Sequence, residues 1–377
     1  METRLGKKRD PAASLGDDLF VRVLSRLPAK SICRCKGVSR PWRRLISHPD
    51  HRKKLPQTLA GFLYGSISLV GGSISSVHHF ACVAGYGGAP SAAPSISFLR
   101  GCAGGDVVPL DSCNGLLLCR CYQPGPHGNG RSKSFNYAVC NPITKKWVMF
   151  SDGSGDGEAR TAFLGFDPAV SSHFHVVEYV TNGGNTITGV LIYSSKAAAW
   201  NFKKSGWGSG IKLSISTEIS VFLNGFLHSV TSFGTIVAVD MEGKSWRMIR
   251  TPPGTHGHCI HQTQGRLCMV THNNVMAPEM SIWVLEDYGT DEWILKHTIS
   301  SLKLFEGRNL WPYPDYKMIA VHPDCNLIFF VFGPNNTLAA YQMNRREMCI
   351  IRNLGLDCFP PYLPYVPWYG ESLANDQ

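Results

Sequence analysis

A strand–turn–strand pattern recurs along most of this chain and limits the folds that are open to it. Each copy is an apolar run, a polar turn and a second run that opens with tryptophan, or with methionine in the last copy. These residues are Trp147, Trp200, Trp246, Trp293 and Met348, at intervals of 53, 46, 47 and 55 residues. A period near 50 residues with four strands per unit is typical of a β-propeller, and residues 57–377 would hold about six such blades. We expect the four tryptophans to pack between blades.

A second turn signature precedes most copies and supports this interpretation. Asn114-Gly115, Asn224-Gly225 and Gln264-Gly265 lie between apolar runs, and Cys325-Asn326 is a weaker version. Asn-Gly is a strong signal for a tight hairpin turn, because both residues tolerate positive φ. Every copy is therefore predicted to contain a further hairpin ahead of its tryptophan.

Glycine, proline and serine gather in three stretches that we expect to be exposed loops: 84–106, 122–134 and 151–160. Long loops on a rigid scaffold commonly carry recognition, but the sequence does not show which loops share a face. The C-terminal run 362–373 could supply a closing strand or a plug for the ring. Its proline content argues against a central strand.

The charge of the chain is concentrated at its beginning. Residues 1–56 carry 15 Lys and Arg against 5 Asp and Glu, whereas residues 57–377 carry 22 of each. So abrupt a change predicts two modules with different roles. The basic residues are interleaved with an apolar pattern, so steering towards an acidic protein explains them as well as nucleic-acid binding does.

Helical spacing is clear in the basic module. Asp17 and Asp18 favour a helix start, and an apolar face is expected to continue from Leu19 to Leu27, where Pro28 stops the helix. A second short helix is predicted over residues 29–36.

A third helix is predicted after Ser39, which is a suitable N-cap. Trp42, Leu45 and Ile46 recur at helical spacing, and Pro49 ends the run. Three helices this short bury little apolar surface, so their exposed apolar faces should seek a partner.

Residues 15–55 resemble the F-box, a helical module that docks onto the Skp-family adaptor of cullin–RING ubiquitin ligases. The resemblance is strongest in 27–31 and at Val38-Ser39 with Trp42, whereas Gly16 and Arg22 depart from the residues that are usual there. It implies that nine residues form the helical core or the adaptor-facing surface, and Trp42 is the best single candidate for an anchor. These residues are Leu15, Leu19, Leu27, Pro28, Ile32, Val38, Trp42, Leu45 and Ile46.

The repeat region is similar to the F-box-associated, kelch-like β-propeller of plant F-box proteins, although the kelch Gly-Gly pair does not recur at regular spacing. The expected fold is therefore multidomain, with a small all-α module followed by an all-β propeller of about six blades. We expect a basic disordered tail at 1–13, an F-box at 14–56 and a target-binding propeller at 57–377.

These resemblances imply the substrate-recognition subunit of an SCF-type ubiquitin ligase. The expected partners are the Skp-family adaptor, the cullin and RING subunits reached through it, and an unknown target protein, with no membrane and no nucleic acid. No catalytic residue and no cofactor are expected, and the location would be cytoplasmic, nuclear or both. A non-degradative scaffold and a propeller enzyme or glycan-binding module remain alternatives.

Weaker signals for chemistry are present in the propeller. The stretch that contains His256, His258, Cys259 and His261 could bind a metal, but no carboxylate is placed near it, so we expect no metal site. Acidic pairs at 286–287 and 291–292 bracket a hairpin turn, where solvated carboxylates are ordinary. The 13 cysteines form no Cys-x-x-Cys pair and are expected to be reduced and mostly buried.

Overall fold

The computed structural model divides the chain into two compact units, 1–58 and 59–377. Within them it describes residues 16–27, 31–32, 35, 38–47, 51, 59–70, 73–83, 94–103, 105–124, 131–153, 160–182, 186–213, 220–253, 256–273, 279–300, 304, 316–323, 325–368, 370 and 373. No helix among these residues is long and apolar enough to cross a membrane.

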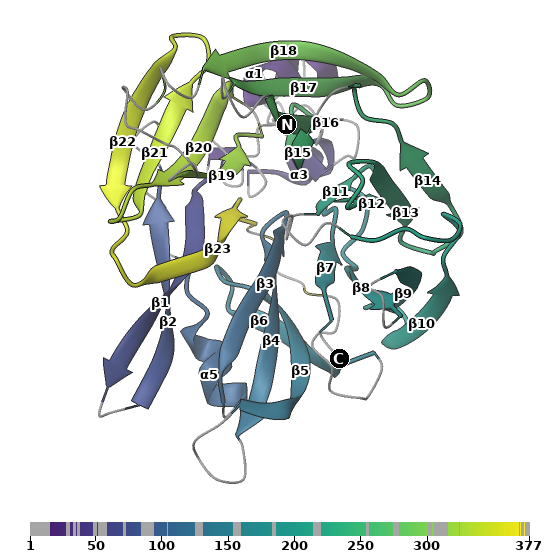
Figure 1. Ribbon diagram of the computed structural model, residues 1–377, viewed down its shortest axis with the longest axis vertical. Coiled ribbons are helices and arrows are strands. Elements are labelled where there is room, and N and C mark those ends of the chain that lie inside the picture. Colours follow the sequence, from purple (N-terminus) through teal and green to yellow (C-terminus); the bar gives the residue numbers. More distant parts are fainter. Residues whose placement is uncertain are drawn as a thin grey trace, which may run out of the picture. The chain divides into compact units, whose positions relative to one another are not determined.

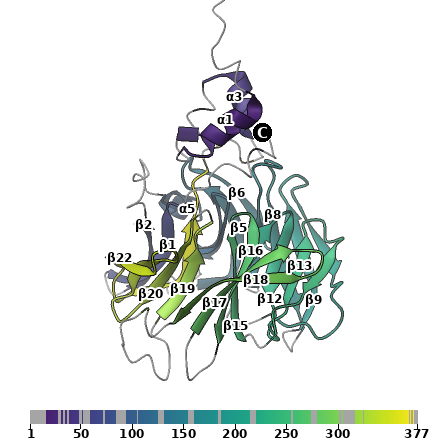
Figure 2. The ribbon, with the colours of Figure 1, turned by 90° about the horizontal axis from the view of Figure 1, so that it is seen from above.

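The first unit contains helix α1 (Asp17–Leu24; Figure 2). The helix begins at the acidic pair Asp17-Asp18, where the sequence predicted a helix start. Both aspartates lie in its first turn, where the helix dipole favours negative charge. The helix is shorter than expected, because residues 25–27 form a turn in which the Leu27 N–H bonds to the Leu24 carbonyl at 2.9 Å. Apolar residues recur at helical spacing as far as Leu27, although the helical backbone ends at Leu24.

Helix α3 (Arg40–Ser47) begins at the predicted cap. The Ser39 hydroxyl accepts a hydrogen bond from the Trp42 N–H at 3.3 Å, so it satisfies a donor that the first turn leaves free. Of the helix predicted over 29–36, Ser31, Ile32 and Cys35 are helical and the other positions lie outside the described residues.

The second unit is a six-bladed β-propeller, as the repeat predicted (Figure 1). Five blades are four-stranded antiparallel sheets whose strands follow one another in sequence. Blade 2 contains β3 (Val107–Cys113), β4 (Leu116–Pro124), β5 (Arg131–Asn141) and β6 (Lys146–Ser151); blade 3 contains β7 (Ala162–Gly165), β8 (His175–Thr181), β9 (Ile187–Ser194) and β10 (Ala199–Lys204). Blade 4 contains β11 (Val221–Leu223), β12 (Phe226–Val230), β13 (Ile236–Asp240) and β14 (Trp246–Ile249); blade 5 contains β15 (His256–Thr263), β16 (Arg266–Asn273), β17 (Glu279–Asp287) and β18 (Glu292–Ser300); blade 6 contains β19 (Tyr316–Val321), β20 (Leu327–Phe332), β21 (Thr337–Gln342) and β22 (Glu347–Asn353).

Blade 1 closes the ring by pairing the two ends of the propeller. It consists of β1 (Gly61–Val70), β2 (Ser73–Cys82) and β23 (Cys358–Tyr365), in the order β2-β1-β23. β23 is the innermost strand of its blade and therefore an edge of the sheet, because it pairs only with β1. The prediction of a closing strand that is not a central strand is confirmed. An innermost strand has one open edge, where proline removes no ladder hydrogen bond.

The repeated turns have the backbone conformations that their residues suggest. Asn114 and Gly115 have φ of 47° and 92°, and the turns at Asn224-Gly225 and Gln264-Gly265 are alike. A second set was not predicted: a non-glycine residue with φ between 51° and 60° stands two positions before Trp147, Trp200, Trp293 and Met348. These residues are Lys145, Ala198, Asp291 and Arg346.

Because successive strands are antiparallel, the ring has two faces with different connections. The turn face carries the passages from the first to the second strand and from the third to the fourth strand of a blade. The loop face carries the other passages. In the part of the chain that the structure describes, its residues include 105–106, 123–124, 152–153, 160–161, 182, 186, 205–213, 231–235, 250–253, 333–336 and 354–357.

The three expected loops are partly regular structure. Helix α5 (Ser97–Ala103) occupies part of 84–106, and β4 and β5 extend into 122–134. The strand ends that flank 122–134 and 151–160 lie on the loop face. Two of the three stretches therefore share one face of the ring.

The C-terminal tail covers the turn face between blades 2 and 3. The Trp368 ring meets Phe166 edge-on at 5.0 Å, and its carbonyl accepts a hydrogen bond from Asn141 at 3.0 Å. A Cβ at Gly115 would approach the Trp368 Cβ to 2.2 Å, so only glycine lets the tail pass this turn. Leu373 is buried in the same cluster.

The left-handed turn residue before β10 predicts a stabilising substitution. Ala198 is exposed at φ 51°, a conformation that costs a non-glycine residue about 1–2 kcal/mol. Glycine avoids this strain and loses about 0.5–1 kcal/mol through greater freedom of the unfolded chain. We therefore expect Ala198→Gly to raise the melting temperature by about 1–2 °C in scanning fluorimetry.

The neighbouring alanine provides a matched control. Ala197 is equally exposed but is not among the residues with positive φ. Ala197→Gly should therefore lower the melting temperature by a similar amount. Equal effects of the two substitutions would contradict the turn geometry.

Candidate protein-binding sites

The apolar residues of the helical module separate into a core and an exposed set. Leu24, Ile32 and Ile46 are buried against one another, with Leu27 half-buried beside them. Leu19, Val23 and Val38 are instead 54%, 56% and 64% exposed. Helical spacing alone did not predict which of these apolar residues are buried and which are exposed.

Trp42 lies at the border between these two sets. It is half-buried, and its ring meets Phe20 edge-on at 4.2 Å. An aromatic pair of this kind contributes about 0.5–1.5 kcal/mol beyond the area that it buries. Leu45 is also half-buried, whereas Leu15 and Pro28 lie outside the described residues.

Two of the repeated tryptophans connect the outer strands of neighbouring blades. The Trp200 indole N–H donates to the Ser151 carbonyl at 2.9 Å, and the Trp293 indole N–H donates to the Arg250 carbonyl at 2.8 Å. In each pair the acceptor lies at or just beyond the last strand of the preceding blade.

The remaining two tryptophans behave differently. Trp246 meets Trp207, which follows the last strand of blade 3, edge-on at 4.6 Å. Trp147 is 38% exposed. The blade-packing role remains a proposal, and it has most support at Trp200, Trp246 and Trp293.

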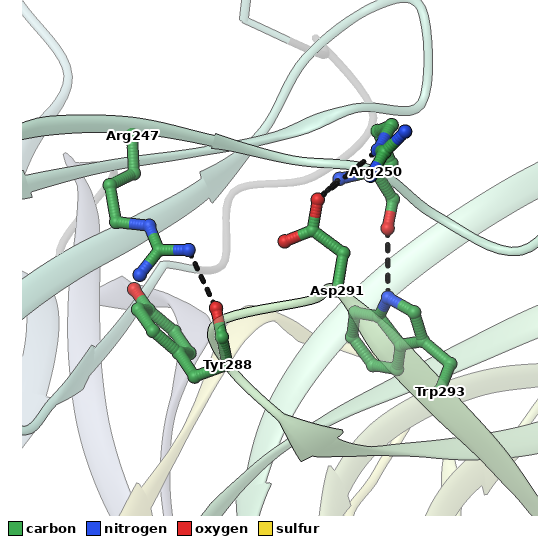
Figure 3. Close-up of polar contacts among 5 residues, drawn as sticks. All are labelled: Arg247, Arg250, Tyr288, Asp291 and Trp293. Carbon is green, nitrogen blue, oxygen red and sulfur yellow. Dashed lines mark hydrogen bonds and ion pairs between the residues drawn. The ribbon is translucent and has the colours of Figure 1, made fainter.

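Blades 4 and 5 are joined by an ion pair in addition to the tryptophan bond (Figure 3). The Arg250 Nε lies 3.3 Å from the Asp291 Oδ2, and the same oxygen accepts the Arg250 backbone N–H at 3.3 Å. Arg250 is largely exposed, so we attribute less than about 1 kcal/mol to the ion pair. Its main consequence is to fix the backbone that accepts the Trp293 bond.

A second contact between these blades is more buried. The Arg247 guanidinium lies over the Tyr288 ring at 4.3 Å and donates to the Tyr288 carbonyl at 2.6 Å (Figure 3). The Tyr288 hydroxyl lies 2.6 Å from His228 Nε2, and His228 Nδ1 lies 3.1 Å from the Val221 carbonyl. A carbonyl can only accept, so Nδ1 carries the proton and Nε2 accepts from tyrosine.

Blades 2 and 3 share a buried polar network that sequence reasoning missed. The Tyr137 hydroxyl donates to the Glu178 carboxylate at 2.5 Å, and Glu178 is fully buried. Burial raises the pKa of Glu178, and the tyrosine bond partly offsets this increase. Arg120 lies 4.7 Å above Phe135 and donates to the Arg160 carbonyl at 2.6 Å. No local pattern marks residues this far apart in sequence.

The structure describes part of the histidine-rich stretch that gave a weak signal for metal binding. His261 is buried, which lowers its pKa to about 4, while burial raises the pKa of Cys259 to about 12. The side chains of His256 and His258 lie outside the described part of the molecule. No group of three or more His, Cys, Asp or Glu side chains in the described ranges could hold a metal ion.

Three of the four acidic residues at 286–287 and 291–292 have polar partners. Glu286 pairs with Arg266, Asp287 accepts the Gly289 N–H at 2.7 Å, and Asp291 pairs with Arg250. These carboxylates therefore organise the hairpin turn and its neighbours.

His228 predicts how stability depends on pH. Burial lowers its pKa to about 4, from 6.5. Between these values the unfolded chain binds a proton that the folded chain does not, so stability falls as the pH falls. From pH 7 to pH 5 the loss from this residue is about 2 kcal/mol.

His228→Asn removes this titration and retains an N–H for the Val221 carbonyl. Its stability deficit relative to the original chain should therefore narrow by about 2 kcal/mol between pH 7 and pH 5, as followed by urea unfolding. A deficit that stays constant with pH would show that His228 is not held neutral at this contact.

Comparison with known families and proteins agrees with this architecture. Residues 13–54 match the F-box domain, and residues 108–337 match the F-box associated beta propeller domain. The F-box protein At5g49610 of Arabidopsis thaliana is 27% identical over 333 residues, which cover 81% of this chain and 86% of that protein. The Arabidopsis F-box protein At5g07610 is 23% identical, over 75% of this chain and 70% of that protein.

Similarity to solved structures is weak. A post-proline cleaving enzyme from Rickettsia typhi aligns over 89% of this chain and 58% of its own, with 10% identity and a TM-score of 0.40. The assignment therefore rests on the two domain matches and on the propeller itself. The chain belongs to the F-box proteins that carry an F-box associated β-propeller domain.

Proposed function

We propose that this chain is the substrate-recognition subunit of an SCF-type ubiquitin ligase. Its helical module would bind a Skp-family adaptor, and through it the cullin and RING subunits. Its propeller would bind a target protein and hold it near the ubiquitin-charged conjugating enzyme. The chain would catalyse no step, and its contribution would be proximity, which converts a bimolecular transfer into a local one.

The observation that carries this proposal is the exposed apolar set of the helical module. Leu19, Val23 and Val38 stay more than half exposed although Leu24, Ile32 and Ile46 already form a core. Exposed apolar residues gathered on so small a unit favour a protein interface. The match to the F-box domain supports a Skp-family adaptor as this partner.

The different burial of the residues that the resemblance grouped together supports different roles for them. We propose that Leu19 and Val38 contact the adaptor and that Ile32 and Ile46 maintain the module. Leu27, Trp42 and Leu45 would do both, because they are half-buried.

These two proposed roles predict two different effects of substitution: loss of adaptor binding alone, or loss of binding together with the fold of the module. Leu19→Ser and Val38→Ser should each weaken adaptor binding about 5- to 30-fold in calorimetry, as at interface positions worth about 1–2 kcal/mol, with helix content unchanged. Ile46→Ala should lower the stability of the module by about 2–5 kcal/mol and should lose binding together with helix content.

Val170→Ser is the matched control, since Val170 is 70% exposed but lies in the propeller between β7 and β8. It should bind the adaptor like the original chain. Failure of the intact chain to bind any Skp-family adaptor would refute the proposed function. Normal binding by both serine variants would refute the assigned surface.

The non-degradative scaffold alternative makes a different prediction once a target is known. A scaffold would bind adaptor and target without increasing ubiquitin transfer to the target in a reconstituted ligase. A receptor would increase that transfer, and the increase would be lost with Leu19→Ser.

A further inference from the structure

An apolar pocket of about 140 Å³ lies between blades 1 and 2. Its walls include Leu63 and Gly65 on β1, Phe359 and Pro361 on β23, and Val108 on β3. Pro360 at its edge is exposed, so the pocket reaches the surface. It lies towards the loop face, where β1 ends and β3 and β23 begin.

Two exposed apolar residues, Ile67 and Leu356, lie further along blade 1 than the pocket. Ile67 pairs directly with Ser76, and Gly65 pairs directly with His78. Paired residues project to the same side of a sheet, and both Ser76 and His78 line the pocket, so Ile67 lies on the pocket side. Ile67 is 52% exposed.

Leu356 lies next to Ile67. The Ile67 N–H bonds to the carbonyl of Asp357 at 3.1 Å, which places the residue before Asp357 beside β1. Leu356 is 70% exposed. We call the pocket, together with the exposed residues Ile67 and Leu356 beside it in the sheet, the anchor site.

The size of the pocket decides which occupant it fits. Small-molecule sites usually measure about 300–1,000 Å³, whereas a cavity of about 150 Å³ accepts a group the size of benzene. The pocket therefore suits a single leucine, methionine or phenylalanine side chain. The buried Ser76 Oγ at this pocket has no hydrogen-bond partner among the described residues and would be available to bond to the main chain of an occupant.

The charge of the whole loop face indicates the rest of the occupant. Apart from Arg250, which pairs with Asp291, the exposed cations at the loop-face strand ends and connections of the described chain are Arg100, Lys204, Lys212, Lys317 and Arg352. Glu279 and Asp357 are the exposed anions there. Arg100 also donates to the Ser76 carbonyl beside the pocket.

The turn face does not share this excess. There the exposed cations among the described residues are Lys145, Lys196, Lys244, Arg266, Arg345 and Arg346, against Glu242, Glu286, Asp287, Glu292 and Glu347. A basic surface attracts acidic partners and disfavours basic ones. The charge asymmetry therefore favours an acidic segment on the loop face.

We propose that the anchor site binds an acidic, extended segment of the target protein through one bulky apolar side chain. This inference rests on the proposed function, because it supplies the recognition element of the target. The apolar side chain would fill the pocket between Gly65 and Phe359, Ile67 and Leu356 would cover its neighbours, and the loop-face cations would attract its acidic flanks.

The test selects peptides from a random linear library displayed on phage, with the full chain bound to its adaptor as bait. We expect enriched peptides to share one Leu, Met or Phe flanked by Asp or Glu. A synthetic peptide of the enriched sequence is then titrated by fluorescence polarisation. Ser76→Phe, which fills the pocket, should weaken its binding at least about 10-fold, as expected for an anchor residue.

Leu356→Ser tests the rim without touching the interior and should weaken binding about 3- to 10-fold. Val170→Ser is the control and should bind the peptide like the original chain. Unchanged melting temperature and adaptor binding show that each variant is folded.

Three results would overturn the anchor site: no enriched peptide, enriched peptides without an apolar position, or binding that Ser76→Phe leaves unchanged. Each of them leaves the proposed function intact if the chain still binds the adaptor. Loss of adaptor binding by the original chain would instead refute the proposed function.

Discussion

The propeller depends on the pairing of β1 with β23. The two strands come from opposite ends of the domain, and their ladder runs from Gly61 opposite Tyr365 to Ser66 opposite Cys358. The other blades pair only strands that follow one another in sequence, so among the described strands this ladder is the one that pairs the two ends of the propeller. A shift of pairing occurs between Leu63 and Gly65, where a Cβ at Gly65 would meet the Phe359 ring at 2.6 Å. The same close approach shapes one wall of the anchor site.

The blades share a backbone plan but not the contacts between them. Turns with positive φ recur at equivalent positions, so each hairpin forms from local sequence. The contacts between neighbouring blades differ. A buried carboxylate and a tyrosine join blades 2 and 3, whereas an arginine, a tyrosine and a neutral histidine join blades 4 and 5. Different polar contacts between different pairs of blades favour a single order of blades, because a buried polar group is costly without its own partner.

Under the proposed function, the two units would recognise different partners. The helical module buries a small core and leaves other apolar side chains exposed. This surface suits a partner that is the same for every target, such as an adaptor. The propeller carries a more basic loop face with an apolar pocket, which suits a segment of a particular target. The ring would hold such a segment at a fixed position, as the proposed transfer to a nearby lysine requires.

The sequence by itself determined the features that depend on neighbouring residues. The period of the tryptophans predicted the blades, Asn-Gly pairs predicted the tight turns, and Ser39 predicted the start of α3, because turns and caps need only a few consecutive residues. Only the tertiary structure decided which apolar residues of the helical module stay exposed, that a proline-rich C-terminal strand is innermost, and that Tyr137 meets Glu178. These outcomes depend on which distant segments lie side by side. One chain position can satisfy the same local pattern whether it faces solvent, a neighbouring blade or a partner, and only the packing of the whole domain selects among them.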